Sequence, residues 1–305
     1  MTSDSSEFAP ERKPPPASSP DDALPAVEAP TIAFVTQLFL APLLIVSIII
    51  AVWLAVTWMV RSGGDPESYV ARLRTPDNGS WQAAASLADM LRNPANEHLK
   101  RDASLAGRVA EALNEQIDAG QMDESWLKLR MFLCRTLGEF QIPQGLPALV
   151  RAAVTERDPA EIVVRRTAIE AIAVLADNTD PAELLKNPEL LPALEAAAAA
   201  GRFDESQQNA EERGELRARA AFALGVLGGD AALAQLARMT DDPYPNARYN
   251  AAVGLARNGD ERAIAELLRM LDPENEAVVA GEEASDPTGV VWKRALVIVN
   301  ALEAV

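Results

Sequence analysis

Cysteine and histidine are almost missing from this 305-residue sequence, which contains one of each, Cys134 and His98. A lone cysteine excludes an intramolecular disulfide and any zinc or iron–sulfur centre held by several cysteines. A lone histidine excludes every site that needs two imidazoles. Aromatic residues make up only 5% of the chain, so a hydrophobic core has to consist mainly of aliphatic side chains.

Basic side chains are also in short supply. The sequence has 28 Lys and Arg against 45 Asp and Glu, which gives a formal net charge of −17 at pH 7. A general nucleic-acid binder needs a basic face that displaces counterions from the phosphates. We therefore expect no nucleic-acid partner.

Periodic apolar residues are missing from the first 32 positions, which carry six acidic and two basic side chains and seven of the 21 prolines. A segment of this composition cannot bury enough apolar surface to offset the entropy lost on ordering. We therefore predict that residues 1–32 form a disordered, acidic tail rich in proline and serine.

Charge is missing altogether from residues 33–60, and residues 38–60 are the most apolar part. A helix that rises ~1.5 Å per residue needs roughly 20 residues to cross a ~30 Å hydrocarbon core. A buried helix of a soluble domain normally has a polar face, and the run is too long for the apolar part of a signal peptide. We therefore predict an uncleaved transmembrane helix over residues 33–60. Its marker residues are Leu38, Pro42, Trp53, Trp58 and Val60.

The basic residues around this segment predict its orientation. Arg61, Arg72 and Arg74 follow it closely, whereas Lys13 and, farther away, Arg12 precede it. Because Lys and Arg accumulate on the cytoplasmic side, we expect the C-terminal part of the chain to be cytoplasmic.

A different pattern begins at residue 61. Ala, Leu, Ile and Val recur at i, i+3, i+4 and i+7, which is typical of amphipathic helices, and no stretch alternates over the length of a strand. Asp–Pro pairs interrupt the pattern, and they suit helix starts because Asp accepts hydrogen bonds from free N–H groups and Pro fits the first helical position. The pairs are Asp65–Pro66, Asp158–Pro159, Asp180–Pro181, Asp242–Pro243, Asp272–Pro273 and Asp286–Pro287. We predict an all-α fold, with a juxtamembrane linker or short helix over residues 61–75 and a helical domain over residues 76–305.

The helical domain contains an internal repeat. Residues 216–225 align with residues 247–256, and both copies share the pattern Arg-x-x-Ala-Ala-x-x-Leu at an offset of 31. Weaker copies contain Arg165, Ala168 and Ile172, and Arg130, Leu133 and Leu137. The last copy keeps the apolar positions without the arginine, at Trp292, Ala295, Leu296 and Val299.

A helix that ends in an Asp–Pro turn, followed by a helix of this pattern, resembles the HEAT repeat. Residues 216–225 and 247–256 are most similar to the short HEAT-like class that is also found in bilin lyases. The resemblance extends over about residues 76–305 and implies an α-solenoid of stacked helix pairs. A single pair cannot bury its apolar stripe, so neighbouring pairs have to stack.

Two segments enlarge the spacing between copies. Residues 201–214 and 273–289 are polar and acidic and lack a helical apolar period. We expect both segments to form loops.

The sequence offers no convincing catalytic or metal site. Glu97, His98 and Asp102 form the only group of an imidazole with nearby carboxylates, and we expect His98 to be a solvated surface residue. HEAT-repeat di-iron hydroxylases require several His–Glu pairs, so their activity is not expected here. Cys134 lies in an apolar helical stretch and is expected to be a buried structural residue. We predict no catalytic residue, no metal and no cofactor.

The repeated arginines are the most regular polar feature. Arg130, Arg165, Arg217 and Arg248 occupy the same repeat position. They could form a ladder that grips an acidic partner, or they could pair internally with an Asp or with carbonyls at helix ends. The resemblance to HEAT repeats favours internal pairing.

These features favour a membrane-anchored scaffold or adaptor that binds another protein through its repeat surface. One alternative is an enzyme or cofactor-handling protein related to HEAT-like lyases. Another is a structural component of the cell envelope. The sequence identifies neither the protein partner nor the oligomeric state.

Overall fold

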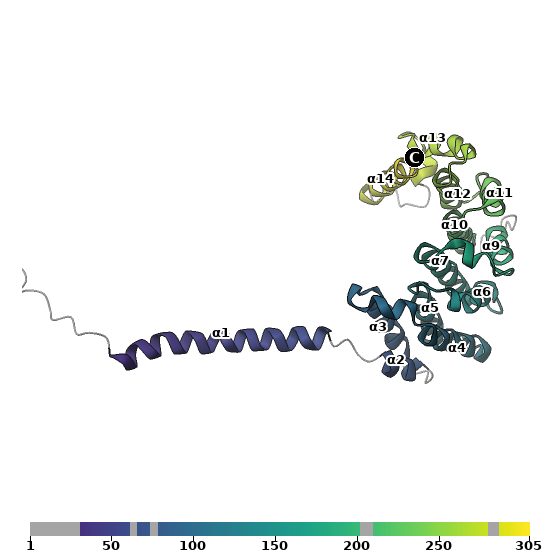
Figure 1. Cartoon of the computed structure of the whole chain (residues 1–305). Coiled ribbons are helices and arrows are strands. Elements are labelled where there is room, and N and C mark those ends of the chain that lie inside the picture. Colours follow the sequence, from purple (N-terminus) through teal and green to yellow (C-terminus); the bar gives the residue numbers. More distant parts are fainter. Residues whose placement is uncertain (1–30, 62–65, 74–78, 202–209, 280–286) are drawn as a thin grey trace, which may run out of the picture. The chain divides into compact units, whose positions relative to one another are not determined.

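Helices provide all the secondary structure of the residues that the computed structural model describes, which are 31–61, 66–73, 79–201, 210–279 and 287–305, and this part contains no strand (Figure 1). The all-α class predicted from the sequence is therefore confirmed for these residues. The chain divides into two units, Met1–Ser62 and Gly63–Val305, and each is described on its own.

The first unit contains one long helix, α1 (Ile32–Arg61), whose length is about 45 Å at the usual rise per residue. Its segment Ile32–Thr57 has a mean hydropathy of 2.8 and none of it is buried. Leu38 and Trp53 are exposed, and Pro42 lies inside the helix. Trp58 and Val60 belong to the helix, but their side chains lie outside the described residues. The tail, residues 1–30, also lies outside them. The chain thus has one long apolar helix near its N-terminus.

The second unit is built from short helices. The α-helices are α2 (Pro66–Leu73), α3 (Ser80–Arg92), α4 (Ala103–Ala119), α5 (Glu124–Gly138), α6 (Leu146–Val154), α7 (Ile162–Asn178), α8 (Pro181–Leu184), α9 (Leu190–Ala199), α10 (Ala210–Leu227), α11 (Asp230–Met239), α12 (Pro245–Arg257), α13 (Ile264–Leu271) and α14 (Pro287–Glu303). Short 3₁₀ helices are η2 (Pro94–Arg101), η3 (Pro143–Gly145), η4 (Pro159–Glu161), η5 (Glu261–Ala263) and η6 (Glu276–Val279).

These helices form two layers. Helices α3, α5, α7, α10 and α12 pack in that order, each against the next, and helices α4, α6, α9 and α11 form the second layer beside them. Figure 1 shows the pairs following one another along an arc. The internal sequence repeat falls on the first layer, because its four copies with an arginine lie in α5, α7, α10 and α12. The sequence repeat therefore corresponds to a structural repeat.

Capping residues explain many of the helix starts. The carboxylate of Asp158 accepts from the Ala160 N–H, and that of Asp180 accepts from the Ala182 N–H, with a proline at the next position in both cases. The expectation that an Asp–Pro pair starts a helix is wrong for Asp242, because α12 begins later, at Pro245. It is also wrong for Asp272, which accepts from the Glu274 N–H in a turn rather than at a helix start.

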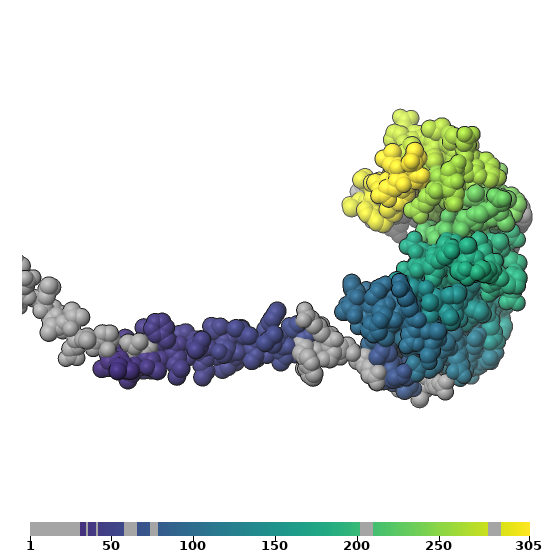
Figure 2. Space-filling view, viewed as in Figure 1, coloured from purple at the N-terminus to yellow at the C-terminus, as the bar shows by residue number. Residues whose placement is uncertain are grey.

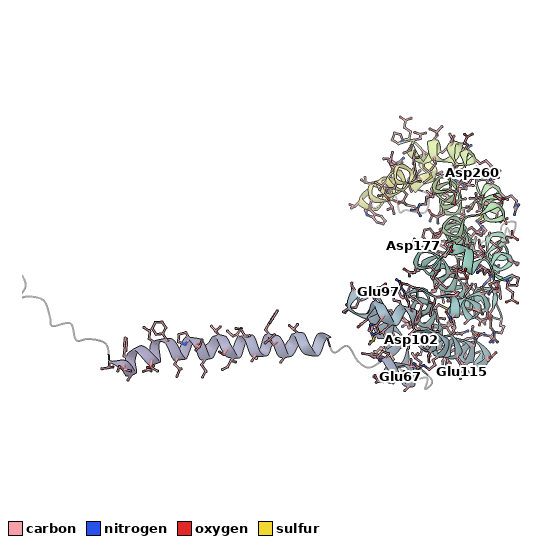
Figure 3. The ribbon with its side chains drawn as sticks, viewed as in Figure 1. Glu67, Glu97, Asp102, Glu115, Asp177 and Asp260 are labelled. Carbon is pink, nitrogen blue, oxygen red and sulfur yellow. The ribbon has the colours of Figure 1, made fainter. Side chains whose placement is uncertain are left out.

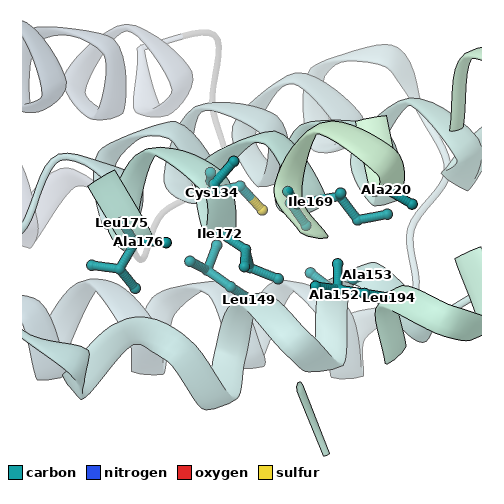
Figure 4. Close-up of a cluster of buried hydrophobic side chains, with 14 of the residues drawn as sticks. Cys134, Leu149, Ala152, Ala153, Ile169, Ile172, Leu175, Ala176, Leu194 and Ala220 are labelled. Carbon is teal, nitrogen blue, oxygen red and sulfur yellow. The ribbon is translucent and has the colours of Figure 1, made fainter. Parts of the chain in front are cut away.

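Small residues set the spacing inside the first layer. A Cβ atom added to Gly225 would lie 2.7 Å from the Cα of Gly254, so α10 and α12 touch backbone to backbone. The rest of the core is aliphatic, as the low aromatic content requires. Figure 4 shows a representative part, in which Cys134 lies among Leu149, Ile172 and other apolar side chains.

The structure corrects the two expected loops. The last part of the segment 201–214 is helical, because α10 already begins at Ala210. Within the segment 273–289, η6 is helical and buries Val278, and α14 begins at Pro287. Residues 202–209 and 280–286 lie outside the described residues. The short helix α2 buries Val70 and Leu73 and packs on α3 and α4.

Candidate functional site

The four repeated arginines lie at corresponding positions in α5, α7, α10 and α12, and each donates to a carboxylate and to a backbone carbonyl. The partners are Glu161 and Gln121 for Arg130, Glu156 and Ala153 for Arg165, Asp242 and Ala200 for Arg217, and Glu266 and Asp242 for Arg248. The carbonyls belong to the ends of the preceding second-layer helices or to the turns that follow them. The arginines thus join neighbouring elements inside the protein.

Arg217 has the most complete set of contacts. Its Nε lies 2.9 Å from one oxygen of Asp242 and its Nη2 lies 3.0 Å from the other, while Nη1 donates to the Ala200 carbonyl at 2.9 Å. Only 4% of the Arg217 side chain and none of the Asp242 side chain is exposed. An acidic partner therefore cannot reach this guanidinium without breaking the core.

Arg130 shares its carboxylate with a second arginine. Burial of Glu161 would raise its pKa, but hydrogen bonds from the side chain and N–H of Arg157 and from Arg130 outweigh that effect and lower the pKa to about 2. The carboxylate is therefore ionised at neutral pH and compensates the buried guanidinium of Arg130. Arg165 differs from the other three, because its partner Glu156 precedes its own helix instead of following it.

The residues examined for metal or catalytic chemistry do not converge. His98 is exposed in η2, Glu97 accepts from the Gln141 amide, and Asp102 caps α4 through the N–H groups of two following residues. The carboxylates labelled in Figure 3 are spread along the helical unit. Among the described residues, no group of three or more His, Cys, Asp or Glu side chains could hold a metal.

Cys134 is unsuited to nucleophilic chemistry. Its side chain is fully buried, and burial raises the pKa of the thiol to about 12. At neutral pH the group is a thiol, which is a much weaker nucleophile than the thiolate.

A cleft of about 720 Å³ opens between α10, α12 and α14. It exists because α14 packs chiefly on α13 and η6, whereas α12 packs along the whole of α10. In Figure 2 the yellow helix α14 stands on the hollow side of the arc. We call this opening the α12–α14 cleft. It is lined by Glu211, Glu215, Ala218, Arg219, Tyr244, Pro245, Asn246, Tyr249, Asn250, Val253, Met270, Trp292, Lys293, Leu296, Val297 and Asn300.

One wall of the α12–α14 cleft is formed by α14 and carries large apolar side chains, although Lys293 and Asn300 also belong to it. Its Trp292 is 66% exposed and its Leu296 is 42% exposed. The repeat positions of α14 at Ala295, Leu296 and Val299 are all exposed. Their equivalents in the preceding copies are fully buried, at Ala220, Ala221 and Leu224 in α10 and at Ala251, Ala252 and Leu255 in α12. The cleft therefore leaves open a face that is a packing interface elsewhere in the repeat.

The opposite wall is polar. Glu215 of α10 accepts from the Tyr244 hydroxyl at 2.5 Å and from the Asn246 amide at 3.1 Å, and Arg219 lies 4.0 Å away. Burial opposes the ionisation of Glu215, but the bonds from Tyr244 and Asn246 prevail and its pKa is lowered. Glu211, one turn earlier, is exposed. This wall therefore presents one carboxylate, Glu215, held in place by neighbouring donors, with the exposed Glu211 beside it.

The floor of the cleft contains a buried hydroxyl. Tyr249 is 4% exposed, and its hydroxyl forms no hydrogen bond of regular geometry with a described residue, although the Arg248 guanidinium lies beside it and interacts with it. Burial raises the pKa of Tyr249 and the nearby guanidinium of Arg248 opposes that rise, so the group stays a neutral hydroxyl. A buried polar group without a well-formed hydrogen bond costs about 1–3 kcal/mol, and the Nε of Arg219, another residue that lines the cleft, is a second such group.

A second groove lies on the other layer of helices, between α4, α6 and α9. It has a volume of about 750 Å³ and is lined by Pro147, Val150, Val154 and Pro192 with Arg151 at its edge. Arg151 is bonded to the side chains that border it on α4. This second groove is apolar and shallow.

Sequence reasoning missed the α12–α14 cleft. It identified Trp292 and Leu296 only as apolar repeat positions and assigned no role to Tyr249. Two signals were present in the sequence: the last copy has Trp292 where the others have arginine, and its offset from the preceding copy is 44 rather than 31. Neither signal reveals that α14 packs mainly on α13 and η6 and only slightly on α12.

One comparison with known proteins, a family model, agrees with the helical repeat. The family model for HEAT repeats matches residues 207–285, which include α10 to α13 and most of the helices around the cleft. No curated protein matches the chain. An engineered protein, whose crystal structure was determined by the Northeast Structural Genomics Consortium, is 16% identical, with 79% of this chain and 98% of that chain covered and a TM-score of 0.35.

Proposed function

We propose that this protein is a membrane-anchored scaffold or adaptor, in which α1 spans the bilayer once and an α-solenoid of HEAT-like repeats binds another protein. HEAT repeats typically mediate protein interactions, and the matched segment 207–285 contributes two of the three helices around the α12–α14 cleft. The observation that carries the proposal is the α12–α14 cleft itself, where repeat positions that are buried elsewhere are exposed beside an unbonded hydroxyl.

The anchor rests on the surface of α1. Soluble proteins rarely expose contiguous apolar patches larger than a few hundred Å². The segment Ile32–Thr57 is apolar on every side and uncovered, and lipid would cover it. Arg61, Arg72 and Arg74 outnumber the basic residues before the helix, which supports a cytoplasmic location of the repeats.

Fractionation of cells that express the tagged full-length chain tests the anchor. We expect the chain in the membrane fraction after an alkaline carbonate wash. The double substitution Ile45→Lys and Ile49→Lys places two charges in the middle of α1, at about 2.5–3.5 kcal/mol each, and should abolish membrane retention. Recovery of the unsubstituted chain in the soluble fraction would refute the anchor.

The single buried cysteine makes the orientation easy to test. Cys134 is shielded, so a cysteine introduced at Ser5 or at Val305 provides the reactive thiol. A maleimide that cannot cross membranes should label Ser5→Cys but not Val305→Cys in intact cells. Labelling of Val305→Cys would reverse the proposed orientation.

Crosslinking in native membranes, followed by purification of the tagged chain, tests partner binding. Leu296→Asp puts a charge in the α12–α14 cleft and should release the partner. Val154→Asp is the matched control, because Val154 is similarly exposed (50%) but belongs to the second groove. No crosslinked protein above the level of an untagged strain would refute the scaffold function.

A further inference from the structure

We propose that the α12–α14 cleft binds a short extended peptide segment of a partner protein, in which an apolar residue stands directly beside a lysine or arginine. This inference rests on the proposed function and specifies the chemistry of the partner.

The size of the α12–α14 cleft is sufficient for a few residues of extended chain. The cleft has a volume of about 720 Å³. The volume lies within the range of pockets that enclose compact ligands and a few residues of extended peptide.

The two walls demand different side chains at neighbouring positions. The α14 wall presents Trp292 and Leu296, and the α10 wall presents the ionised carboxylate of Glu215 with Glu211 at the rim. Successive side chains of an extended peptide point to opposite sides. A residue that packs on α14 is therefore followed by one that faces the carboxylates, and an apolar–basic pair satisfies both walls.

Charge favours a basic residue at the second position. The chain carries a net charge of −17, which attracts basic segments over longer distances. Arg219, on the same α10 wall, and Lys293 of α14 also line the cleft, so its two acidic and two basic side chains balance. The preference for a basic residue therefore rests on the exposed carboxylate of Glu211 at the rim and on the net charge of the chain. The exposed face of Trp292 can additionally stack against a guanidinium or an aliphatic stem.

The Tyr249 hydroxyl fits the backbone of such a peptide. Tyr249 lines the cleft, and its buried hydroxyl has only the neighbouring Arg248 guanidinium beside it and forms no hydrogen bond of regular geometry with a described residue. A carbonyl of an extended peptide would accept from it, which converts an unfavourable buried group into a bonded one. A hydrogen bond to the peptide backbone contributes affinity for any sequence, whereas the two walls select which side chains the peptide carries.

Fluorescence anisotropy with defined peptides tests the proposal on the full-length chain in detergent micelles. The probe is a labelled eight-residue peptide in which leucine alternates with lysine. One control alternates leucine with glutamate and the other alternates serine with lysine, and empty micelles correct for binding to detergent. We expect the leucine–lysine peptide to bind at least tenfold more tightly than either control. Equal binding of the serine–lysine peptide, or no binding of the leucine–lysine peptide, would overturn the proposal.

Substitutions locate the binding. Tyr249→Phe removes only the hydroxyl and should weaken peptide binding by roughly 2- to 10-fold while leaving the thermal unfolding of the free protein unchanged or slightly improved. Leu296→Asp should abolish binding, and Val154→Asp should leave it intact. Binding that survives Leu296→Asp would overturn the assignment to this cleft. If partner crosslinking persists in Leu296→Asp as well, the scaffold function stands and only this inference falls.

Discussion

Replacement of Arg217 by methionine tests whether the repeated arginines hold the helical stack together. We predict that Arg217→Met lowers the free energy of unfolding by about 3–5 kcal/mol, because it leaves the buried carboxylate of Asp242 without its cation. Methionine keeps the aliphatic stem, so the loss measures charge and hydrogen bonding rather than a cavity. The variant also loses the bond to the Ala200 carbonyl, which ties α10 to the end of α9.

The magnitude follows from the burial of the pair. Asp242 has no exposed side-chain surface, and its oxygens accept from Nε and Nη2 of Arg217 at 2.9–3.2 Å. Removal of both charges avoids the isolated carboxylate. The double variant Arg217→Met with Asp242→Leu should therefore recover most of the loss, although the N–H of Tyr244 then loses its acceptor.

Urea unfolding of the full-length chain in detergent micelles, followed by circular dichroism at 222 nm, measures the effect. Lys186→Met is the matched control, because its ion pair with Glu183 is exposed on both sides (68% and 51%) and should contribute no more than about 1 kcal/mol. A loss below about 1 kcal/mol in Arg217→Met would refute the reasoning. So would a double variant that is less stable than the single one.

Three further predictions concern the stability and reactivity of the second unit. Gly225→Ala should destabilise it by about 1–3 kcal/mol in urea unfolding, because the new Cβ meets Gly254, whereas Gly107→Ala, with free space around it, should be neutral or stabilising. The lowered pKa of Glu161 stabilises the fold above pH 4.5 by about 3 kcal/mol, and this contribution disappears as the pH falls towards 2. The stability difference between the unsubstituted chain and Glu161→Gln should therefore shrink over that interval, and a constant difference would contradict the assignment. Cys134 should react with iodoacetamide only after unfolding, and fast labelling of the native chain would contradict its burial.

The periodic part of the fold was accessible from the sequence because it depends on local rules. Apolar residues at helical spacing, small residues at packed positions and Asp at helix starts act over a few residues, and the helices follow them. The equivalence of Arg217 and Arg248 was also readable, since a repeated sequence that stacks on itself places equal residues in equal surroundings. Internal pairing with an Asp or a terminal carbonyl was predicted for the arginines, but only Arg217 pairs with an Asp, whereas the carboxylate partners of the other three are Glu.

The turns depart from the local rules where tertiary contacts compete. Asp242 was expected to cap the start of a helix at Pro243. In the structure, its carboxylate instead accepts from Arg217 and from the Tyr244 N–H, and α12 starts later. A buried guanidinium offers stronger, charge-assisted bonds than the N–H groups of a helix start. That competition involves residues 25 positions apart, and no single window of the sequence contains both.

The α12–α14 cleft arises from the same kind of departure at the end of the array. Residues 240–244 form the short connection between α11 and α12, and α12 packs along α10. The connection between α13 and α14 is longer and comprises residues 272–286. Part of this longer connection folds back as η6, which buries Val278 and supports α14, and Arg294 of α14 donates to the Asn275 carbonyl. The described part of the segment that was expected to be a loop, η6, thus packs on α14, which makes few contacts with α12. Leu296 is exposed at this end of the array, where the repeat is interrupted, and it belongs to the binding surface that we propose.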